Sequence, residues 1–255
     1  MTRSLPSACL LVTLAAAPAL AQSRTPQSST PPAIPLGIVW VNGGWQTPSR
    51  SFSDSLTFDQ YAEQGKADIQ YKVAAGPVYE GGFGVRLWKA LGIGVSYSRF
   101  SNTSTAPVSA SIPHPFFFNQ PRAISGTATN ITHDESTVNA QVLVFVPAGS
   151  RLLLVLSAGP SFITVQQDLV TAVHWDEAYP FDTATFRSAD TVSPSNRSTG
   201  VNASADIVFR FGKSFGVGAL LRYTQAKVDL TPTGGHTVSV DAGGFQAGAG
   251  IRVMF

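Results

Sequence analysis

The residues best suited to chemistry are histidines that lie close to carboxylates. The four histidines are His114, His133, His174 and His236. Acidic residues follow two of them, directly in "HDE" and after one tryptophan in "HWDE". Imidazoles and carboxylates held together can bind Zn²⁺ or supply a general base. No HExxH or other fixed ligand spacing occurs, and no GxSxG motif selects one of the many serines as a nucleophile. The sequence therefore predicts no metal site, no catalytic site, no cofactor and no enzyme.

A second set of charged residues falls inside otherwise apolar runs: Glu80, Arg86, Asp206, Arg210, Arg222, Asp241 and Arg252. A charge enclosed by protein is costly unless an opposite charge pairs with it. These residues therefore predict an interior network of salt bridges that fills the structure. The alternative is an arginine-lined path for small anions, and what surrounds the charges decides between the two.

The elements that position these charges show a period of two. In 215–223 the odd positions are apolar, from Phe215 to Tyr223, and they alternate with Gly216, Gly218, Leu220 and Arg222. The final stretch, "DAGGFQAGAGIRVMF", alternates in the same way up to Phe255. A period of two indicates strands with two different faces. The polar row holds mainly Gly and Ser with a few charges, which suits a narrow lumen of about eight strands better than a hydrophobic core.

The gaps between the alternating runs are of two kinds. Short gaps occur at 89–90, 147–150 and 212–214, whereas long gaps rich in Ser, Thr, Asn, Pro and Asp occur at about 48–68, 103–133 and 172–197, with a shorter one at 230–236. The kinds alternate along the chain. We therefore predict eight strands, near 37–47, 70–88, 91–102, 134–146, 151–171, 198–211, 215–229 and 237–255. All short turns then lie at one end and all long loops at the other.

The N-terminal segment predicts export. Arg3 precedes the apolar run "ACLLVTLAAAPAL", and Ala19-Leu20-Ala21 follows it, which is the pattern of a secretory signal peptide over 1–21. Residues 22–36 are rich in Pro, Ser, Thr and Gln and predict a disordered periplasmic linker before a single domain at 37–255. The one cysteine, Cys9, lies in the signal, so the mature chain has no thiol. The net charge of +2 gives no nucleic-acid-binding excess.

Strands with one apolar face, short turns at one end and long loops at the other are typical of bacterial outer-membrane barrels. On these features and the terminal Phe255, the sequence resembles the small outer-membrane β-barrel family of the OmpA/OmpX type over about 37–255. The resemblance implies an all-β, eight-stranded antiparallel transmembrane up-and-down barrel in the outer membrane of a Gram-negative-type bacterium. It also implies outer-membrane lipids as neighbours and Phe255 as the signal that the barrel assembly machinery reads. A secreted soluble barrel or sandwich is the alternative architecture.

Two of the long gaps are rich in aromatic residues. "SIPHPFFFNQPR" places Phe116, Phe117 and Phe118 in a row, and "HWDEAYPFDTATF" contains Trp175 and Tyr179. Exposed aromatic side chains on loops are typical of a contact surface. The loops equally fit a simpler arrangement, in which they pack on one another and cap the barrel.

The sequence thus favours a monomeric barrel with a structural role, or with a surface-interaction or adhesion role toward a ligand or protein at its loops. A narrow porin-like channel for small solutes is the second hypothesis, and an outer-membrane enzyme is the third.

Overall fold

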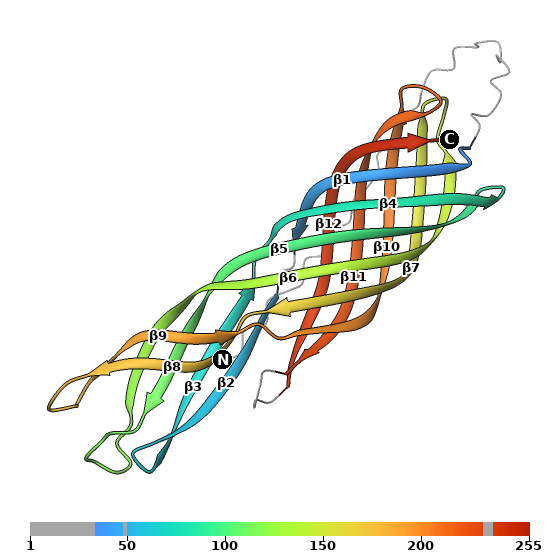
Figure 1. Cartoon of the computed structure of the whole chain (residues 1–255). Helices are drawn as coiled ribbons and strands as arrows, with labels where there is room; N and C mark the ends of the chain where they lie inside the picture. Colours follow the sequence, from blue (N-terminus) through green and yellow to red (C-terminus); the bar gives the residue numbers. More distant parts are fainter. Residues whose placement is uncertain (1–33, 48–49, 232–236) are drawn as a thin grey trace, which may run out of the picture. The chain divides into compact units, whose positions relative to one another are not determined.

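Eight antiparallel strands close into a ring in the computed structural model, which describes residues 34–47, 50–231 and 237–255. Each strand pairs with both neighbours in the ring, and β1 closes it by pairing with β12 and β4 (Figure 1). In ring order the strands are β4 (Gly76–Trp88), β1 (Gly37–Thr47), β12 (Val238–Met254), β11 (Phe215–Leu230), β10 (Ser195–Arg210), β7 (Leu152–Gln167), β6 (Arg122–Pro147) and β5 (Leu91–Ile112). This confirms the predicted eight-stranded barrel. The predicted signal peptide and residues 22–33 of the predicted linker lie outside the described residues.

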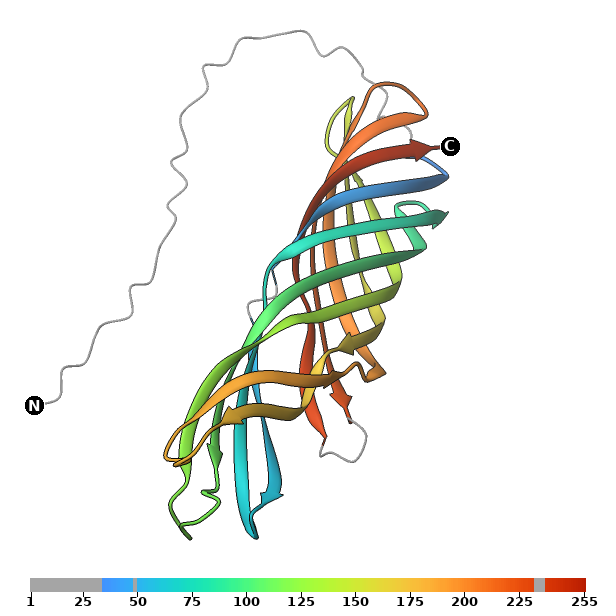
Figure 2. The same ribbon diagram turned by 60° about the vertical axis from the view of Figure 1, so that its left-hand side comes forward.

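Four further strands stand beyond one end of the ring: β2 (Arg50–Gln60), β3 (Glu63–Val73), β8 (Leu169–Glu177) and β9 (Ala184–Val192). Strands β2 and β3 form a hairpin that joins the sheet where Lys66–Ile69 pairs with Val108–Ser111 of β5. Strands β8 and β9 form a separate two-stranded sheet. These four strands and the adjoining ends of β5 and β6 make up the lobe, which the two ribbon views show extending from the ring (Figure 2). The long gaps predicted at 48–68, 103–133 and 172–197 are therefore largely folded as strands.

The polarity of the two strand faces reverses along β11. From Phe215 to Tyr223 the apolar side chains point outward, whereas Gly216, Gly218 and Arg222 point inward. Beyond Tyr223 the alternation continues, but the outward residues are Gln225, Lys227 and Asp229 and the inward residues are Ala226, Val228 and Leu230. The strand is thus apolar outside in its first half and apolar inside in its second half.

The two larger of the three apolar clusters in the described residues follow from this reversal. The larger one fills the lobe and the adjoining end of the ring, with Ile69, Val108, Ile131 and Val228 among its fully buried members. The smaller one lies inside the ring near the short turns and is formed by Ile38, Trp40, Leu143, Phe145, Leu153, Val155, Val208 and Met254. Polar side chains occupy the ring between the two clusters. The sequence prediction of an interior without a hydrophobic core therefore holds only for this middle part.

The short turns and both ends of the described domain lie together at the end of the ring away from the lobe (Figure 1). The backbone N–H groups of Leu36 and Gly37 both donate to the Phe255 carbonyl oxygen, at 2.7 and 2.9 Å. Leu36 in turn accepts a hydrogen bond from the Arg86 backbone N–H at 2.7 Å. The last residues of the predicted linker are therefore tied to the barrel.

Candidate functional site

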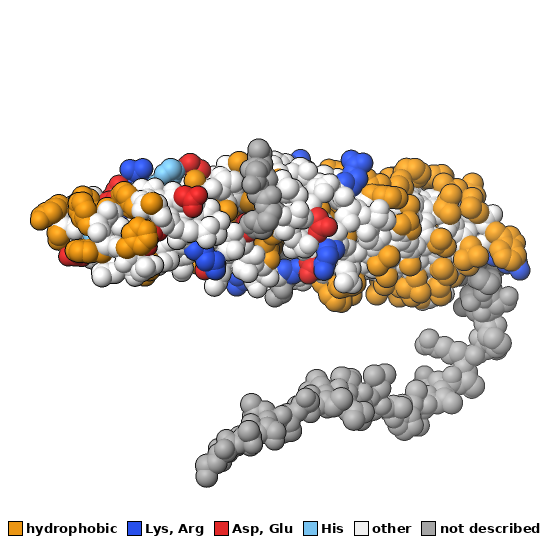
Figure 3. All heavy atoms as spheres, turned by 90° about the horizontal axis from the view of Figure 1, so that it is seen from below, with side chains coloured by type: hydrophobic (Ala, Val, Ile, Leu, Met, Phe, Trp, Pro, Cys, Tyr) orange, Lys and Arg blue, Asp and Glu red, His pale blue; other side chains and the backbone are white. Residues whose placement is uncertain are grey.

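An apolar belt surrounds the part of the ring nearest the short turns. Its outward side chains include Val41, Phe83, Ile93, Val142, Leu156, Ile207, Val217 and Ile251, all more than a third exposed. Figure 3 shows hydrophobic side chains gathered over this part of the surface and again at the opposite end of the same face, with charged side chains mainly between them. On β11 the belt spans the nine residues Phe215–Tyr223, the length that a tilted strand needs to cross a bilayer.

Aromatic rings mark both edges of the belt. Trp45, Tyr79, Tyr223 and Phe245 are exposed at the edge nearest the lobe, and the Tyr223 and Phe245 ring centroids lie 5.2 Å apart. Trp88, Phe211, Phe215 and Phe255 are exposed at the opposite edge. Amphipathic rings prefer the membrane–water interface, and such girdles frame the apolar band of outer-membrane barrels. In such barrels the short turns are periplasmic and the long connections extracellular, which places the lobe outside the cell.

Two ion pairs lie inside the barrel at the level of the belt. The Arg222 guanidinium lies 2.8 Å from Glu80 Oε1, which also accepts a hydrogen bond from Trp40 Nε1 at 2.9 Å. Arg252 donates to both carboxylate oxygens of Asp206, at 2.7 and 2.8 Å. All four residues are at most 9% exposed. Each charge thus has a partner of opposite sign, as burial requires.

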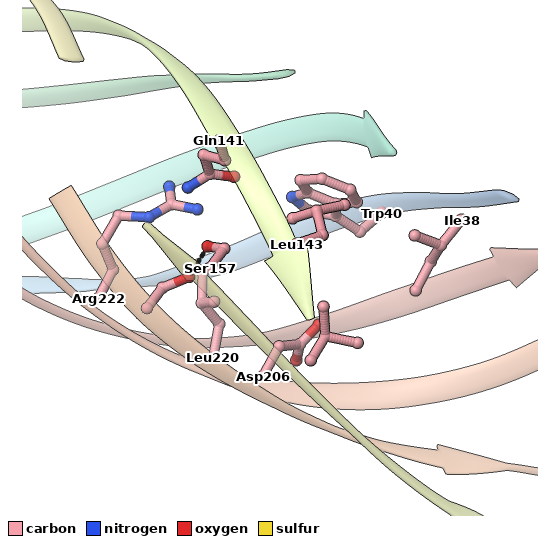
Figure 4. A pocket seen from close by; sticks show the side chains of 10 residues that line it. Ile38, Trp40, Gln141, Leu143, Ser157, Asp206, Leu220 and Arg222 are labelled. Atoms are coloured by element: carbon pink, nitrogen blue, oxygen red, sulfur yellow. Dashed lines mark hydrogen bonds between the residues drawn. The ribbon is translucent and has the colours of Figure 1, made fainter. Parts of the chain in front are cut away.

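A cavity of about 20 Å³ lies next to these pairs, bordered by Trp40, Gln141, Ser157, Asp206 and Arg222. Figure 4 shows Arg222, Gln141 and Ser157 directed toward the same space. Ser157 exchanges a hydrogen bond with Ser204 at 2.6 Å on its border. A space of this size holds about one water molecule.

A second polar layer lies above the ion pairs, toward the lobe. Glu135 accepts from Gln46 Nε2 at 2.8 Å and lies 3.0 Å from His133 Nε2, and Gln246 donates to Gln46 at 2.7 Å. The Nδ1 atom of His133 lies 2.7 Å from Gln167 Oε1. His133 is only 2% exposed. The sequence prediction placed this histidine in or beside a loop, because it did not anticipate that β6 begins at Arg122.

The remaining charges of the predicted interior set lie elsewhere. Asp241 is exposed on the outer face of β12, opposite Lys227 of β11. Its predicted place in the lumen is wrong. Along β12 the odd-numbered side chains, including Asp241, face outward, and even-numbered ones such as Arg252 face inward. Arg86 and Arg210 are half-buried at the periplasmic end, where they donate to the carbonyl oxygens of Pro35, Lys89 and Ser150.

Phe255 presents its side chain to the outside, with 65% of its surface exposed. Its ring lies over Gly37, in the space that a Cβ atom on that residue would need. The residue therefore combines an exposed ring at the edge of the belt with backbone bonds that close the ring between β1 and β12. Its role as an assembly signal stays a prediction.

An aromatic cluster lies at the far end of the lobe. Phe116, Phe117, Phe118 and Tyr179 are 67%, 51%, 69% and 84% exposed. They come from the β5–β6 and β8–β9 connections, and Phe181 joins the two, because its ring lies 5.5 Å from Phe116 and 6.2 Å from Tyr179. We call these five residues the aromatic tip. The sequence prediction named four of them and missed Phe181, although it lies in the same aromatic stretch.

A buried arginine holds the loops of the aromatic tip together. Arg122, with a side chain 5% exposed, lies 2.6 Å from Glu177 and donates to the carbonyl oxygens of Phe181 at 3.0 Å and Pro113 at 2.8 Å. Glu177 also accepts a hydrogen bond from the Tyr61 hydroxyl, in the β2–β3 turn, at 2.6 Å. Arg122 and Glu177 therefore link all three hairpin ends of the lobe.

These contacts shift the protonation equilibria of the two partners. Burial alone would raise the pKa of Glu177, but hydrogen bonds from Tyr61 and Arg122 outweigh it, and the pKa lies below its ordinary value. The same hydrogen bond to Glu177 raises the pKa of Tyr61. The linkage is thus intact when the carboxylate is charged and the phenol is protonated.

The other predicted loop residues are structural or lie apart. Trp175 is only partly exposed and packs on the apolar cluster of the lobe, 5.4 Å from the Phe58 ring, so its place on the contact surface stays a prediction. The Nδ1 atom of buried His114 accepts hydrogen bonds from the backbone N–H groups of Phe116 and Phe117, which shapes the tip. His174 is paired with Asp190 at 2.8 Å, and His236 lies outside the described residues.

Within the described ranges, no three His, Cys, Asp or Glu side chains are placed to hold a metal ion. Over the same residues, no helix is long and apolar enough to span a membrane.

Comparison with known proteins finds similarity at the level of structure. No family model and no curated protein sequence matches the chain. The outer membrane protein OprG from Pseudomonas aeruginosa is similar with a TM-score of 0.49 and 10% identity, covering 87% of this chain and 97% of OprG. Neisserial surface protein A gives a TM-score of 0.43 and 14% identity, covering 86% and 97%. Ail, the attachment invasion locus protein of Yersinia pestis, gives a TM-score of 0.37 and 13% identity, covering 85% of this chain and 98% of Ail.

The fold assignment rests on the geometry of this chain. Its ring of strands is closed, its outer surface at the belt is apolar, its interior at the same level holds two ion pairs beside a small apolar cluster, and its turns are short at one end and long at the other. Closure matters because a bilayer interior tolerates no unpaired strand edge. Together these features are those of a bacterial barrel of the outer membrane. The protein is an eight-stranded outer-membrane β-barrel with an extracellular lobe.

Proposed function

We propose that this barrel acts at the cell surface and contacts a partner through the aromatic tip, while its lumen stays closed. The observation that carries the proposal is the exposure of Phe116, Phe117, Phe118 and Tyr179 at the end of an ordered lobe. Monomeric proteins rarely expose such clusters without a binding role. Rigid aromatic anchors also lose little conformational entropy when they bind.

The construction of the lobe supports a contact surface over a simple cap. The apolar cluster of the lobe is already filled by residues such as Ile69, Val108 and Val228, so the tip rings are not needed to cover it. The linkage of Arg122 and Glu177 instead holds the rings in place at the surface. The tip therefore resembles a preformed binding surface, and we assign the barrel a surface-interaction or adhesion role as a monomer of the OmpA/OmpX type.

The narrow channel is the less favoured function. Paired charges and an apolar cluster containing Trp40, Phe145 and Met254 occupy the lumen at the level of the belt and toward the periplasmic end. We propose no catalytic role and no cofactor. Outer-membrane lipids and the assembly machinery remain the expected partners of the barrel itself.

Adhesion of bacteria that display the protein tests the proposal. Cells displaying the wild-type protein should bind an epithelial cell layer better than cells with an empty vector. The triple variant Phe116→Ser, Phe117→Ser and Phe118→Ser should lose most of this difference at equal surface amounts. A matched control replaces three exposed polar residues on the flank of the lobe: Ser109→Ala, Ser111→Ala and Ser125→Ala. Adhesion that is absent in the wild type or unchanged in the Phe variant would contradict the proposal.

A further inference from the structure

The charges of this barrel are strongly separated along its axis. All 15 Asp and Glu residues of the chain are described, and 13 of them lie at or beyond the second polar layer, in the extracellular direction. The other two, Glu80 and Asp206, are neutralised by Arg222 and Arg252 in the lumen. The periplasmic end carries five cationic side chains and, within the described residues, no carboxylate side chain: Arg86, Lys89, Arg151, Arg210 and Lys213. We call these five the basic rim.

The basic rim surrounds a hollow at the periplasmic end of the barrel. The hollow has a volume of about 710 Å³, and four cationic side chains line it together with Leu36, Phe211 and Phe255: Arg86, Arg151, Arg210 and Lys213. Arg86 donates to the carbonyl oxygens of Pro35 and Lys89 at 3.1 and 3.2 Å. Neutral acceptors of this kind orient a guanidinium without cancelling its charge. The hollow is therefore both positively charged and partly apolar.

The basic rim also lies directly beside the membrane. The exposed rings of Trp88, Phe211 and Phe255 mark the periplasmic edge of the belt. The Lys89 ammonium lies 4.8 Å from the Trp88 ring centroid, so at least one rim cation is held at the level of that edge. Cations next to an aromatic girdle lie at the depth of lipid headgroups.

We propose that the basic rim binds the phosphate groups of anionic phospholipids in the periplasmic leaflet of the membrane. Arginine and lysine are the side chains that bind phosphate best, and the exposed rings contact the adjoining acyl chains. The acidic excess of the lobe lies at the opposite end, where it does not screen the rim, because the distance exceeds the Debye length at physiological salt. The rim would thus anchor the barrel and fix its depth at the periplasmic side.

Quenching of Trp88 fluorescence by brominated lipids tests this proposal. In a Trp45→Phe background, Trp88 is the tryptophan that faces lipid, because Trp40 lies in the lumen and Trp175 in the lobe. The barrel is reconstituted in phosphatidylethanolamine vesicles with a minor fraction of brominated phosphatidylglycerol or brominated phosphatidylcholine. We expect quenching several-fold stronger with the anionic lipid, and a preference that falls as salt is raised.

Two variants in the Trp45→Phe background distinguish an effect of the basic rim from an effect of the protein's overall charge. Lys89→Gln, Arg151→Gln and Lys213→Gln remove three exposed rim cations and should bring the quenching ratio to about one. Removal of three exposed cations on the extracellular side of the belt, by Lys66→Gln, Lys72→Gln and Lys227→Gln, should leave the ratio unchanged. Equal quenching by both lipids before these changes, or the same ratio in both variants, would overturn the proposal. Both variants should retain heat-modifiable gel migration, which reports that the barrel is folded.

Discussion

Arg222 and Glu80 meet at 2.8 Å in the lumen although their strands, β11 and β4, are separated in the ring by β12 and β1. Arg252 reaches Asp206 in a similar way, from β12 to β10 past β11. The interior pairs therefore join strands that share no backbone hydrogen bonds. They hold the ring across its lumen, while the ladders hold it around its circumference.

Removal of one partner should show what this pairing contributes. Glu80→Gln leaves the Arg222 charge buried and unpaired, which costs about 3–5 kcal/mol. The double variant Glu80→Gln with Arg222→Met removes both charges and should regain most of that loss. Urea unfolding in lipid vesicles measures the free energy of unfolding of both variants. A single variant as stable as the wild type would mean that the pair does not neutralise a buried charge.

The reversal of polarity on β11 predicts how the loss of stability caused by an added charge depends on the depth of that charge in the membrane. Ala219 lies at the centre of the belt on the outer face, and Gln225 lies on the same face beyond Tyr223. Ala219→Arg should destabilise the barrel by about 2–4 kcal/mol and Gln225→Arg by about 0–1 kcal/mol, because only the first places a charge in hydrocarbon. Unfolding in lipid vesicles measures both losses of stability. Equal losses would show that the belt does not end near Tyr223.

The linkage between Arg122, Glu177 and Tyr61 predicts a pH window for order at the aromatic tip. Glu177 has a lowered pKa in the folded protein, so its contribution is present above the ordinary glutamate pKa of about 4.3 and is lost as the pH falls through the folded value. Tyr61 has a raised pKa, so its contribution is present below about 10 and is lost at higher pH.

Hydrogen exchange of the amides in 113–121 and 178–183, corrected for intrinsic rates, measures this order. Protection should be greatest between these limits and should fall below about pH 4. In Glu177→Gln the acid-dependent part of the change should disappear. Protection that rises on acidification would show that the charged carboxylate does not stabilise the tip.

We predict that the exposed ring of Phe255 acts during assembly. In the folded barrel, the hydrogen bonds of Phe255 to β1 are made by its backbone and do not need the ring. Phe255→Ala should lower the amount of inserted barrel while export continues, because the backbone bonds between β1 and β12 do not depend on the ring. Phe211→Ala removes an equally exposed ring from the same edge and serves as the control. The heat-modifiable fraction on a gel reports insertion. A loss of equal size in both variants would assign the effect to the aromatic girdle.

The strand pattern could be predicted from the sequence because the belt imposes a strict period of two. The rows of 215–223 and 245–255 place Arg222 and Arg252 in the lumen from sequence alone. Asp241 was misplaced because a polar residue in a strand near the belt was taken to face inward. Beyond Tyr223 the outside is water, so outward polar residues are also expected there.

The lobe could not be predicted in the same way. Its strands bury one face in the larger apolar cluster, which also contains residues of β11 and β12. Such tertiary contacts leave only weak local signals in segments rich in Ser and Thr. Trp175 and His133 were therefore assigned to loops, although both lie on strands. Arg122 lies next to Pro121 with no motif around it, and only the meeting of three hairpin ends reveals its role.

Planar-bilayer conductance tests the closed lumen most directly, and with it the assignment of function to the lobe. Paired charges and the apolar cluster of Trp40, Phe145 and Met254 should give the wild-type barrel almost no steady current. The double variant Arg210→Ala with Arg222→Ala leaves Glu80 without its partner, and it should be less stable and show flickering current. A wild-type barrel that conducts steadily, with an anion preference that is lost in this variant, would contradict the account and establish the channel instead.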